Sequence, residues 1–174
     1  HKIRKRDLGV QQSDHEMELD DVDKGILFLL QQDARHLTTK EMGERVGVSA
    51  STVRNRIERL EDEGIIRGYH PDIDYDKAGL QLHVLFICSA ESADRDRLAT
   101  EACSVNGVVQ TQEVLNGSDN LQVEAVGTDT DDIARISDAL HDLGLDVVNS
   151  KILKSTRVQP FDHFGRDVVE DGDE

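Results

Sequence analysis

The sequence contains no tryptophan, and aromatic residues of all kinds make up only 3% of its 174 residues. Any β-sheet in this chain must therefore pack through valine, isoleucine and leucine. The two cysteines, Cys88 and Cys103, lack the spacing of metal ligands, and one pair in a chain of this size is not a disulfide framework. No apolar run approaches the length of a membrane span, and the charged N-terminus lacks a signal peptide's apolar core. These absences favour a cytoplasmic protein with no membrane association.

Basic residues are also scarce relative to acidic ones. The chain has 20 lysines and arginines and 36 aspartates and glutamates, which gives a net charge of −16. The acidic residues are interleaved with ordinary core residues, whereas a disordered acidic chain would lack apolar periodicity. The pattern resembles proteins of salt-loving archaea, whose carboxylate-rich surfaces stay hydrated in concentrated salt. An ordinary acidic protein of a mesophile is the alternative.

Residues 34–60 reverse this balance. The segment carries a charge of +3, which leaves −19 on the remainder of a chain whose total is −16. Local charge, more than net charge, decides whether a surface can approach phosphate. The acidic residues of the segment are Glu41, Glu44 and Glu58, and its basic residues are Arg35, Lys40, Arg45, Arg54, Arg56 and Arg59.

Three short helices are predicted across residues 19–66. Asp20 is placed to cap the first, whose apolar face includes Ile26 and Leu30. Thr38 with Glu41 three residues later forms a capping-box pattern for the second helix. The glycine at position 47 closes that helix, Ser49 caps the third, and Gly64 stops it. The last two helices and their glycine turn make a helix-turn-helix.

The third helix has two distinct faces. Val53, Ile57 and Leu60 share one face at helical spacing, so they pack inward, while Ser51 and Asn55 lie opposite. Small polar residues permit close entry into a major groove, and Asn and Arg can bond base edges or phosphates. A helix-turn-helix that serves only protein packing is the alternative. The predicted DNA-binding residues are Ser49, Ser51, Thr52, Arg54, Asn55, Arg56 and Arg59.

The second half of the chain predicts a βαββαβ domain, with an antiparallel sheet that carries both helices on one face. The whole chain is thus α+β, a helix-turn-helix domain followed by a ferredoxin-like domain. The uncovered sheet face needs a partner, which predicts oligomerisation. The expected strands are 80–90, 108–115, 121–128 and 145–158, and the expected helices are 92–107 and 129–144.

The stretch "VGVSASTVRNRIERLEDEGIIRGY", followed by a linking strand and a βαββαβ domain, resembles the Lrp/AsnC (feast/famine) family of transcriptional regulators. The resemblance extends from Leu19 to Val158. It implies a DNA-binding protein, with a winged-helix-like reading domain, that regulates amino-acid or general metabolism and is not an enzyme. It also implies a homodimer through the C-terminal sheets that assembles to a tetramer or octamer, with double-stranded DNA as partner.

Many members of that family bind an amino acid near a glycine and an acidic residue in the turn after the second strand of the C-terminal domain. By this resemblance the effector site would comprise Gly117, Ser118 and Asp119. The family often has an aromatic residue after the acidic one, whereas this turn is one residue shorter and continues with Asn120. A hairpin turn with no ligand is the alternative. No cofactor is expected other than such a small-molecule effector.

Two rival interpretations remain. Siroheme decarboxylases look similar to this family and bind a tetrapyrrole through His and Arg, but the histidines here are scattered, and a lone one such as His83 is more often packed or solvated. The cluster His70, Asp72, Asp74 and Asp76 could bind a metal, although a solvated acidic linker is the favoured interpretation and no metal site is predicted. RNA binding by the sheet is not expected, because it lacks stacking aromatics.

The ends of the chain complete the predicted organisation. The basic residues at 2–6 could form an arm that touches phosphate, or only a flexible leader. The end of the chain is expected to be a mobile acidic extension. The predicted segments are 1–18 (leader), 19–66 (helix-turn-helix), 67–79 (linker strand), 80–158 (ferredoxin-like domain) and 159–174 (acidic tail).

Overall fold

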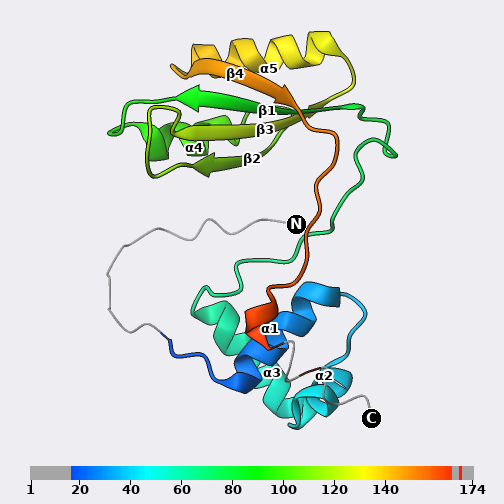
Figure 1. Cartoon of the computed structure of the whole chain (residues 1–174). Helices are drawn as coiled ribbons and strands as arrows, with labels where there is room; N and C mark the ends of the chain where they lie inside the picture. Colours follow the sequence, from blue (N-terminus) through cyan, green and yellow to red (C-terminus); the bar gives the residue numbers. More distant parts are fainter. Residues whose placement is uncertain (1–16, 166–168, 170–174) are drawn as a thin grey trace. The chain divides into compact units, whose positions relative to one another are not determined.

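The computed structural model describes residues 17–165 and Val169. The chain divides into two compact units (Figure 1), one comprising residues 1–70 with 158–174 and the other residues 71–157. The chain therefore leaves the first unit, builds the second, and returns to the first with its C-terminal segment. The predicted basic arm at residues 2–6 lies outside the described residues.

Three helices form the first unit, and each begins at the predicted cap. Asp20, Thr38 and Ser49 each accept a hydrogen bond from the backbone N–H three residues further on. The side chains of Asp23 and Glu41 return a bond to the cap residue's own N–H, so the first two helices carry complete capping boxes. The helices are α1 (Asp21–Asp33), α2 (Thr39–Val46) and α3 (Ala50–Asp62).

The turn between α2 and α3 is tight. Gly47 has a φ of 79°, the left-handed conformation that glycine adopts without strain, and its N–H bonds the Gly43 carbonyl at 2.8 Å. A Cβ atom at Gly43 would lie 2.5 Å from the carbonyl oxygen of Val48. The absence of a side chain at Gly43 therefore lets the backbone that enters α3 cross directly over α2.

The core of the first unit includes residues from all three helices. Ile26 and Leu29 of α1 and Val53 and Leu60 of α3 are completely buried. Burial of aliphatic side chains of this size stabilises a fold by about 1.5–3 kcal/mol each. Because Val53 and Leu60 lie one above the other on α3, their burial turns the opposite face of that helix outward.

The C-terminal segment completes this core. Residues Asp162–Phe164 form the short helix η1, the Phe161 N–H donates to the Gln31 side chain of α1 at 3.1 Å, and Phe164 packs against the core. Val169 is only 1% exposed within the same cluster. The prediction of a mobile acidic tail is therefore wrong for these residues. The abundant acidic residues obscured two apolar side chains that anchor the segment.

Residues 67–79, predicted as a linker strand, contain no strand. The backbone N–H groups of Ile65 and Ile66 both bond the Leu60 carbonyl and end the helical region, and residues 75–79 form a turn that closes at Gly79. Two glycines and Pro71 interrupt the segment, and proline cannot donate to a strand ladder. The boundary between the two units falls between His70 and Pro71.

The second unit confirms the predicted βαββαβ order. Its four strands pair in the order β2-β3-β1-β4, and each neighbouring pair is antiparallel (Figure 1). The first two strands in the chain are thus separated in space by β3, as the ferredoxin-like arrangement requires. The elements are β1 (Leu82–Ser89), α4 (Arg95–Ala102), β2 (Val108–Glu113), β3 (Leu121–Gly127), α5 (Thr130–Asp142) and β4 (Asp146–Ile152).

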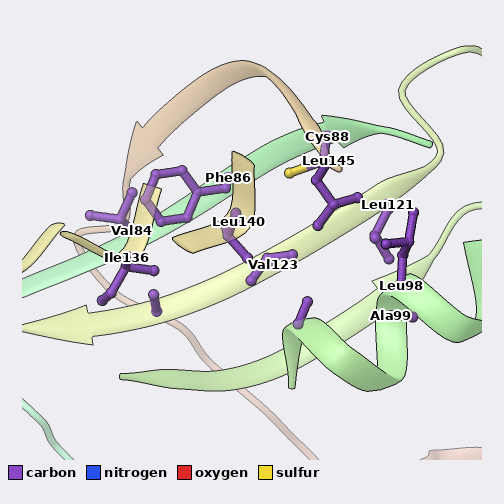
Figure 2. Close-up of a cluster of buried hydrophobic side chains, with 12 residues drawn as sticks. Val84, Phe86, Cys88, Leu98, Ala99, Leu121, Val123, Ile136, Leu140 and Leu145 are labelled. Atoms are coloured by element: carbon purple, nitrogen blue, oxygen red, sulfur yellow. The ribbon is translucent and has the colours of Figure 1, made fainter. Parts of the chain in front are cut away.

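Both helices cover one face of this sheet. Figure 2 shows Phe86 of β1 and Val123 of β3 in one cluster with Ile136 and Leu140 of α5 and Leu98 of α4. Each of these side chains is at most 4% exposed. With so few aromatics in the chain, the sheet packs mainly through branched aliphatic residues, as the composition predicted.

Within the second unit, all of whose residues the structure describes, the other face of the sheet carries no helix. Because Val84, Phe86 and Cys88 point into the core, the alternate residues of β1 face the opposite way, and Leu85 and Ile87 are partly exposed there. Leu85 pairs with Glu124 of β3 and with Lys151 of β4. The open face therefore has an aliphatic centre bordered by charged and amide side chains.

Candidate nucleic-acid interface

The first turn of α3 presents a cluster of three hydroxyl groups. Ser49 Oγ accepts the Thr52 N–H at 3.2 Å and lies 3.1 Å from Ser51 Oγ and 2.9 Å from Thr52 Oγ1. Ser49 thus caps the helix and also orients the two neighbouring hydroxyls. The free N–H groups and the dipole of a helix N-terminus favour an anion such as phosphate at this end.

Arg54 and Asn55 follow directly and are exposed. In the part of the chain that the structure describes, neither side chain has a hydrogen-bond or ion-pair partner, so both can bond an external group. A guanidinium group can bond guanine in a bidentate manner, and an amide can do the same with adenine. Together with Ser51, these residues form the outward face of the first two turns of α3.

Arg56 and Arg59 are placed differently from the prediction. Arg56 Nη1 lies 2.7 Å from Asp20 Oδ2 and 3.0 Å from Asp23 Oδ1, and Arg59 Nη2 lies 3.2 Å from Asp23 Oδ2. Asp23 is completely buried. Both arginines are therefore engaged within the domain, and the structure does not bring them together with Ser51, Arg54 and Asn55 as free cations.

The pKa values of this network reflect its hydrogen bonds. The pKa of Asp20 is lowered from 3.8, first by the backbone N–H of Asp23 and also by the Arg56 guanidinium. The pKa of Arg56 is raised by its bonds to Asp20 and then to Asp23. Both shifts favour the charged forms of Asp20 and Arg56, so this ion pair persists at neutral pH.

The position of Asp23 was missed in the sequence, although a signal exists. Asp23 precedes Ile26, Leu27 and Leu30 by three, four and seven residues, so it lies on the apolar face of α1. A carboxylate on a buried face requires a cation partner. The sequence does not say which cation, because the partners are 33 and 36 residues away.

Charge restricts the interface to one end of α3. In the described residues, Lys40 and Arg45 of α2 and Arg54 of α3 have no ion-pair partner. The second half of α3 carries Glu58, Glu61 and Asp62, all exposed. These carboxylates would repel phosphate, so only the first two turns of α3, with α2 beside them, suit an approach to DNA.

The predicted effector residues lie in the loop between β2 and β3. Gly117 has a φ of 91°, and Ser118 Oγ lies 3.4 Å from Asp119 Oδ1, with all three residues exposed. The next residue, Asn120, is 5% exposed, accepts the Ala90 N–H at 2.9 Å and donates to the Ala90 carbonyl at 2.7 Å. The Asn120 amide thus holds the loop against the end of β1. In the sequence, Asn120 was noted only because the family often has an aromatic residue at this position.

The structure does not assemble the other candidate sites, the acidic cluster at residues 70–76 and His83, into a metal or catalytic site. Among the described residues, no three His, Cys, Asp or Glu side chains gather as a metal site would require, and Asp74 instead accepts the Lys77 N–H at 3.0 Å. His83 lies 3.4 Å from Glu124 on the open sheet face and packs edge-on against Tyr75. No described helix combines the length and the apolar character that crossing a membrane requires.

Comparison with known proteins identifies the first unit as a DNA-binding domain. Residues 19–67 match the family model described as winged helix-turn-helix DNA-binding. The chain is 32% identical over 120 residues to the HTH-type transcriptional regulator AldR of Mycolicibacterium smegmatis, an alignment that covers 68% of this chain and 70% of AldR. It is 34% identical to the HTH-type transcriptional regulator LrpB of Bacillus subtilis, over 58% of this chain and 78% of LrpB.

The chain belongs to the Lrp/AsnC family. It is a DNA-binding helix-turn-helix transcriptional regulator, and these relatives give no support to the siroheme-decarboxylase alternative. Its fold is also similar to that of a transcriptional regulator from Neisseria meningitidis solved in complex with L-Met. The TM-score is 0.68 at 26% identity, over 84% of this chain and 99% of that one.

Proposed function

We propose that the regulator reads double-stranded DNA by placing the first two turns of α3 in the major groove. Ser51, Arg54 and Asn55 would bond base edges, while the hydroxyls of Ser49 and Thr52 would contact phosphate. The observation that carries this proposal is the freedom of Arg54 and Asn55, because the other two arginines of the helix are held by carboxylates. Lys40 and Arg45 of α2 would add phosphate contacts beside the groove.

A homodimer would present two such helices to a partly palindromic site. The open sheet face supports this part of the proposal, because Leu85 and Ile87 form an aliphatic strip that is only partly covered. Pairing of two such faces would bury the strip and bring the two units that carry α3 into one particle. Further assembly to a tetramer or octamer would add avidity without new contacts to DNA.

An amino acid is the proposed effector. The support is that a structural neighbour was solved with L-Met, and that the loop with Gly117, Ser118 and Asp119 is exposed next to a buried anchor at Asn120. A carboxylate such as Asp119 suits an amino group. Isothermal titration of the protein with L-methionine and other amino acids, repeated with Asp119→Asn, would test this loop. Equal heats from both proteins would reject it.

We also propose that the regulator works in the cytoplasm of a salt-loving archaeon. The support is the charge of −16 in 174 residues. In such a cytosol, counterion release adds little to DNA binding, because its gain vanishes as bulk salt rises. Affinity would then depend on base contacts, shape and assembly. A steep loss of operator binding between moderate and multimolar KCl would count against this setting.

The docking is tested by titrating operator DNA with Asn55→Ala and Arg54→Gln variants. Chromatin pull-down with sequencing, in cells grown with and without added amino acids, would supply the operator. Each variant should lose about 1–3 kcal/mol of specific binding. Arg97→Gln on α4 is the matched control, since Arg97 is an exposed helical arginine of the other unit. Unchanged operator binding by Asn55→Ala and Arg54→Gln would reject this face of α3.

A further inference from the structure

Two arginines of the DNA-reading helix converge on one buried carboxylate of another helix. Arg56 and Arg59 are one turn apart on α3, and each takes a different oxygen of Asp23, at 3.0 and 3.2 Å. Arg56 also bonds Asp20 at 2.7 Å, and the Asp20 N–H donates to Asp23 Oδ2 at 3.2 Å. The N-terminus of α1 is therefore joined to the middle of α3 by a network of directional bonds.

We infer that Asp23, assisted by Asp20, is a positioning residue for DNA recognition that holds Arg56 and Arg59 away from phosphate and sets the rotation of α3. This inference rests on the proposed docking of α3. Hydrophobic contacts are not directional, so Val53 and Leu60 alone would allow α3 to roll slightly on α1. Two bonds from successive turns to one carboxylate permit much less rotation, because a roll lengthens at least one of them.

The arginines cannot easily be transferred to DNA. The Asp23 side chain has no exposed surface, and a buried carboxylate that loses its partners carries a large desolvation cost. A phosphate drawn to Arg59 would also be repelled by the same carboxylate. Arg54 has no such restraint, since it is exposed and unpaired among the described residues. Of the three arginines of α3, Arg54 thus contacts DNA, whereas Arg56 and Arg59 fix the orientation of the helix.

Burial also makes the Arg56–Asp23 pair less sensitive to salt than exposed ion pairs are. Exposed charges are strongly screened at high ionic strength, whereas buried pairs are screened much less. Arg56 is 29% exposed in its side chain and Asp23 is not exposed at all, so this pair persists where phosphate contacts weaken. The orientation of α3, and with it the choice of base sequence, would then survive conditions that weaken non-specific binding.

The test compares Arg54→Gln, Arg56→Gln, Arg59→Gln and Asp23→Asn as full-length proteins. Binding to operator and to random DNA is measured across a KCl series, and each variant's folded fraction is determined at the assay temperature. Arg54→Gln should lower operator affinity more than random-DNA affinity, because the proposed docking places Arg54 on a base edge. A contact of Arg54 with phosphate would instead reduce the slope of log affinity against log salt by about 0.9 per protomer, which also locates Arg54 on DNA.

Arg59→Gln is expected to keep the wild-type slope and lower only the ratio of operator to random-DNA affinity. Asp23→Asn frees Arg59 and leaves Arg56 paired only with Asp20, so it should steepen the slope and strengthen random-DNA binding while that ratio falls. A purely structural role would instead lower both affinities in proportion to the unfolded fraction. If Asp23→Asn does not fold, Arg59→Gln still decides, because Arg56 continues to neutralise Asp23.

A salt slope that falls by about 0.9 per protomer in Arg59→Gln or Arg56→Gln would overturn the inference, since those arginines would then touch phosphate. An unchanged ratio of affinities in Arg59→Gln and Asp23→Asn would also overturn it. Failure of the docking proposal looks different, because Arg54→Gln and Asn55→Ala would then leave both slope and operator affinity unchanged.

Discussion

Gly43 lies where α2 meets the backbone that leads into α3. An added Cβ would approach the Val48 carbonyl oxygen to 2.5 Å and the Ser49 carbonyl carbon to 3.3 Å, and neither backbone atom can move away cheaply. Alanine in a helix interior gains about 0.5–1 kcal/mol over glycine, whereas overpacking costs about 1–3 kcal/mol. We expect Gly43→Ala to destabilise the first unit by about 1–2 kcal/mol, measured by urea denaturation.

Glu44→Ala is the control for this substitution, because Glu44 is the next residue of α2 and is exposed. It should change the midpoint of unfolding little. A Gly43→Ala protein as stable as the wild type would mean that the chain around Val48 relaxes without cost. Operator binding that is lost while stability is kept would show that the crossing of α2 and α3 has shifted.

The two cysteines differ in burial, so we expect their thiols to differ in reactivity toward alkylating reagents. Cys88 is completely buried in the sheet core, and desolvation, with a further contribution from the Asp146 carboxylate, raises its pKa to about 11. Cys103 is exposed at the end of α4. Iodoacetamide at pH 8 should therefore alkylate Cys103 in the native protein and Cys88 only after denaturation. Mass spectrometry after a time course checks this, and a Cys103→Ser protein that is alkylated while native would contradict it.

At the scale of elements, three helices depend on carboxylates at their N-termini. Backbone N–H donors lower the pKa of Asp20 at α1, Glu41 at α2 and Asp132 at α5, with the N–H of Asp23, Thr38 and Thr128 as the respective main cause. A pKa lowered in the folded state means that the unfolded state binds more protons. The stabilisation is therefore complete above the unfolded values, near 3.8 for Asp and 4.5 for Glu, and is lost as the pH falls below them.

Urea denaturation between pH 7 and pH 3 should show this loss beginning near pH 4.5. The Glu41→Gln protein removes one of the titrating groups, so its stability should depend less steeply on pH in that range. Arg35 lies outside the caps, and Arg35→Gln serves as a control with the wild-type pH profile. Identical profiles for Glu41→Gln and wild type would show that the capping box of α2 does not contribute.

The hairpin loop after β2 shows how one element is fixed by another. Asn120 bonds both the N–H and the carbonyl of Ala90, which is 30 residues earlier in the chain. An amide side chain can donate and accept at once, so it satisfies both groups of one residue. The predicted effector residues Gly117 to Asp119 are therefore carried on a loop whose end is anchored to β1.

At the scale of the whole molecule, the DNA-reading unit is built from two segments separated by the entire sheet domain. Val169 is 1% exposed in the core that contains Ile26, and Val158, in the same C-terminal segment, is 76% exposed. We expect Val169→Ala to destabilise the first unit by about 1–3 kcal/mol, because it leaves a cavity, and Val158→Ala to have little effect.

Hydrogen exchange of the α1 amides measures this loss locally, since subglobal opening reports the stability of one unit. Protection in α1 should fall in Val169→Ala, while protection in β1 and β3 stays at the wild-type level. Equal protection of α1 in the two valine variants would show that the C-terminal segment adds nothing to the DNA-reading unit.

The elements whose causes are local can be predicted from the sequence. Caps at Asp20, Thr38 and Ser49, the glycine turn at Gly47 and the apolar periodicity of each helix depend on residues within one or two turns, so the helix-turn-helix and the βαββαβ order could be predicted. The exposed residues of the candidate interface, Ser51, Arg54 and Asn55, were found in the same way, from a face opposite an apolar one.

Which charges are free depends on contacts between segments that are distant in the sequence. Asp23 meets Arg56 and Arg59 across 33 and 36 residues, and Val169 enters a core formed more than a hundred residues earlier. Helical spacing specifies which side of a helix a residue occupies, but the partner on that side depends on how distant segments pack. The same sequence pattern of three arginines therefore contains one exposed cation, Arg54, and two that are paired with carboxylates inside the fold.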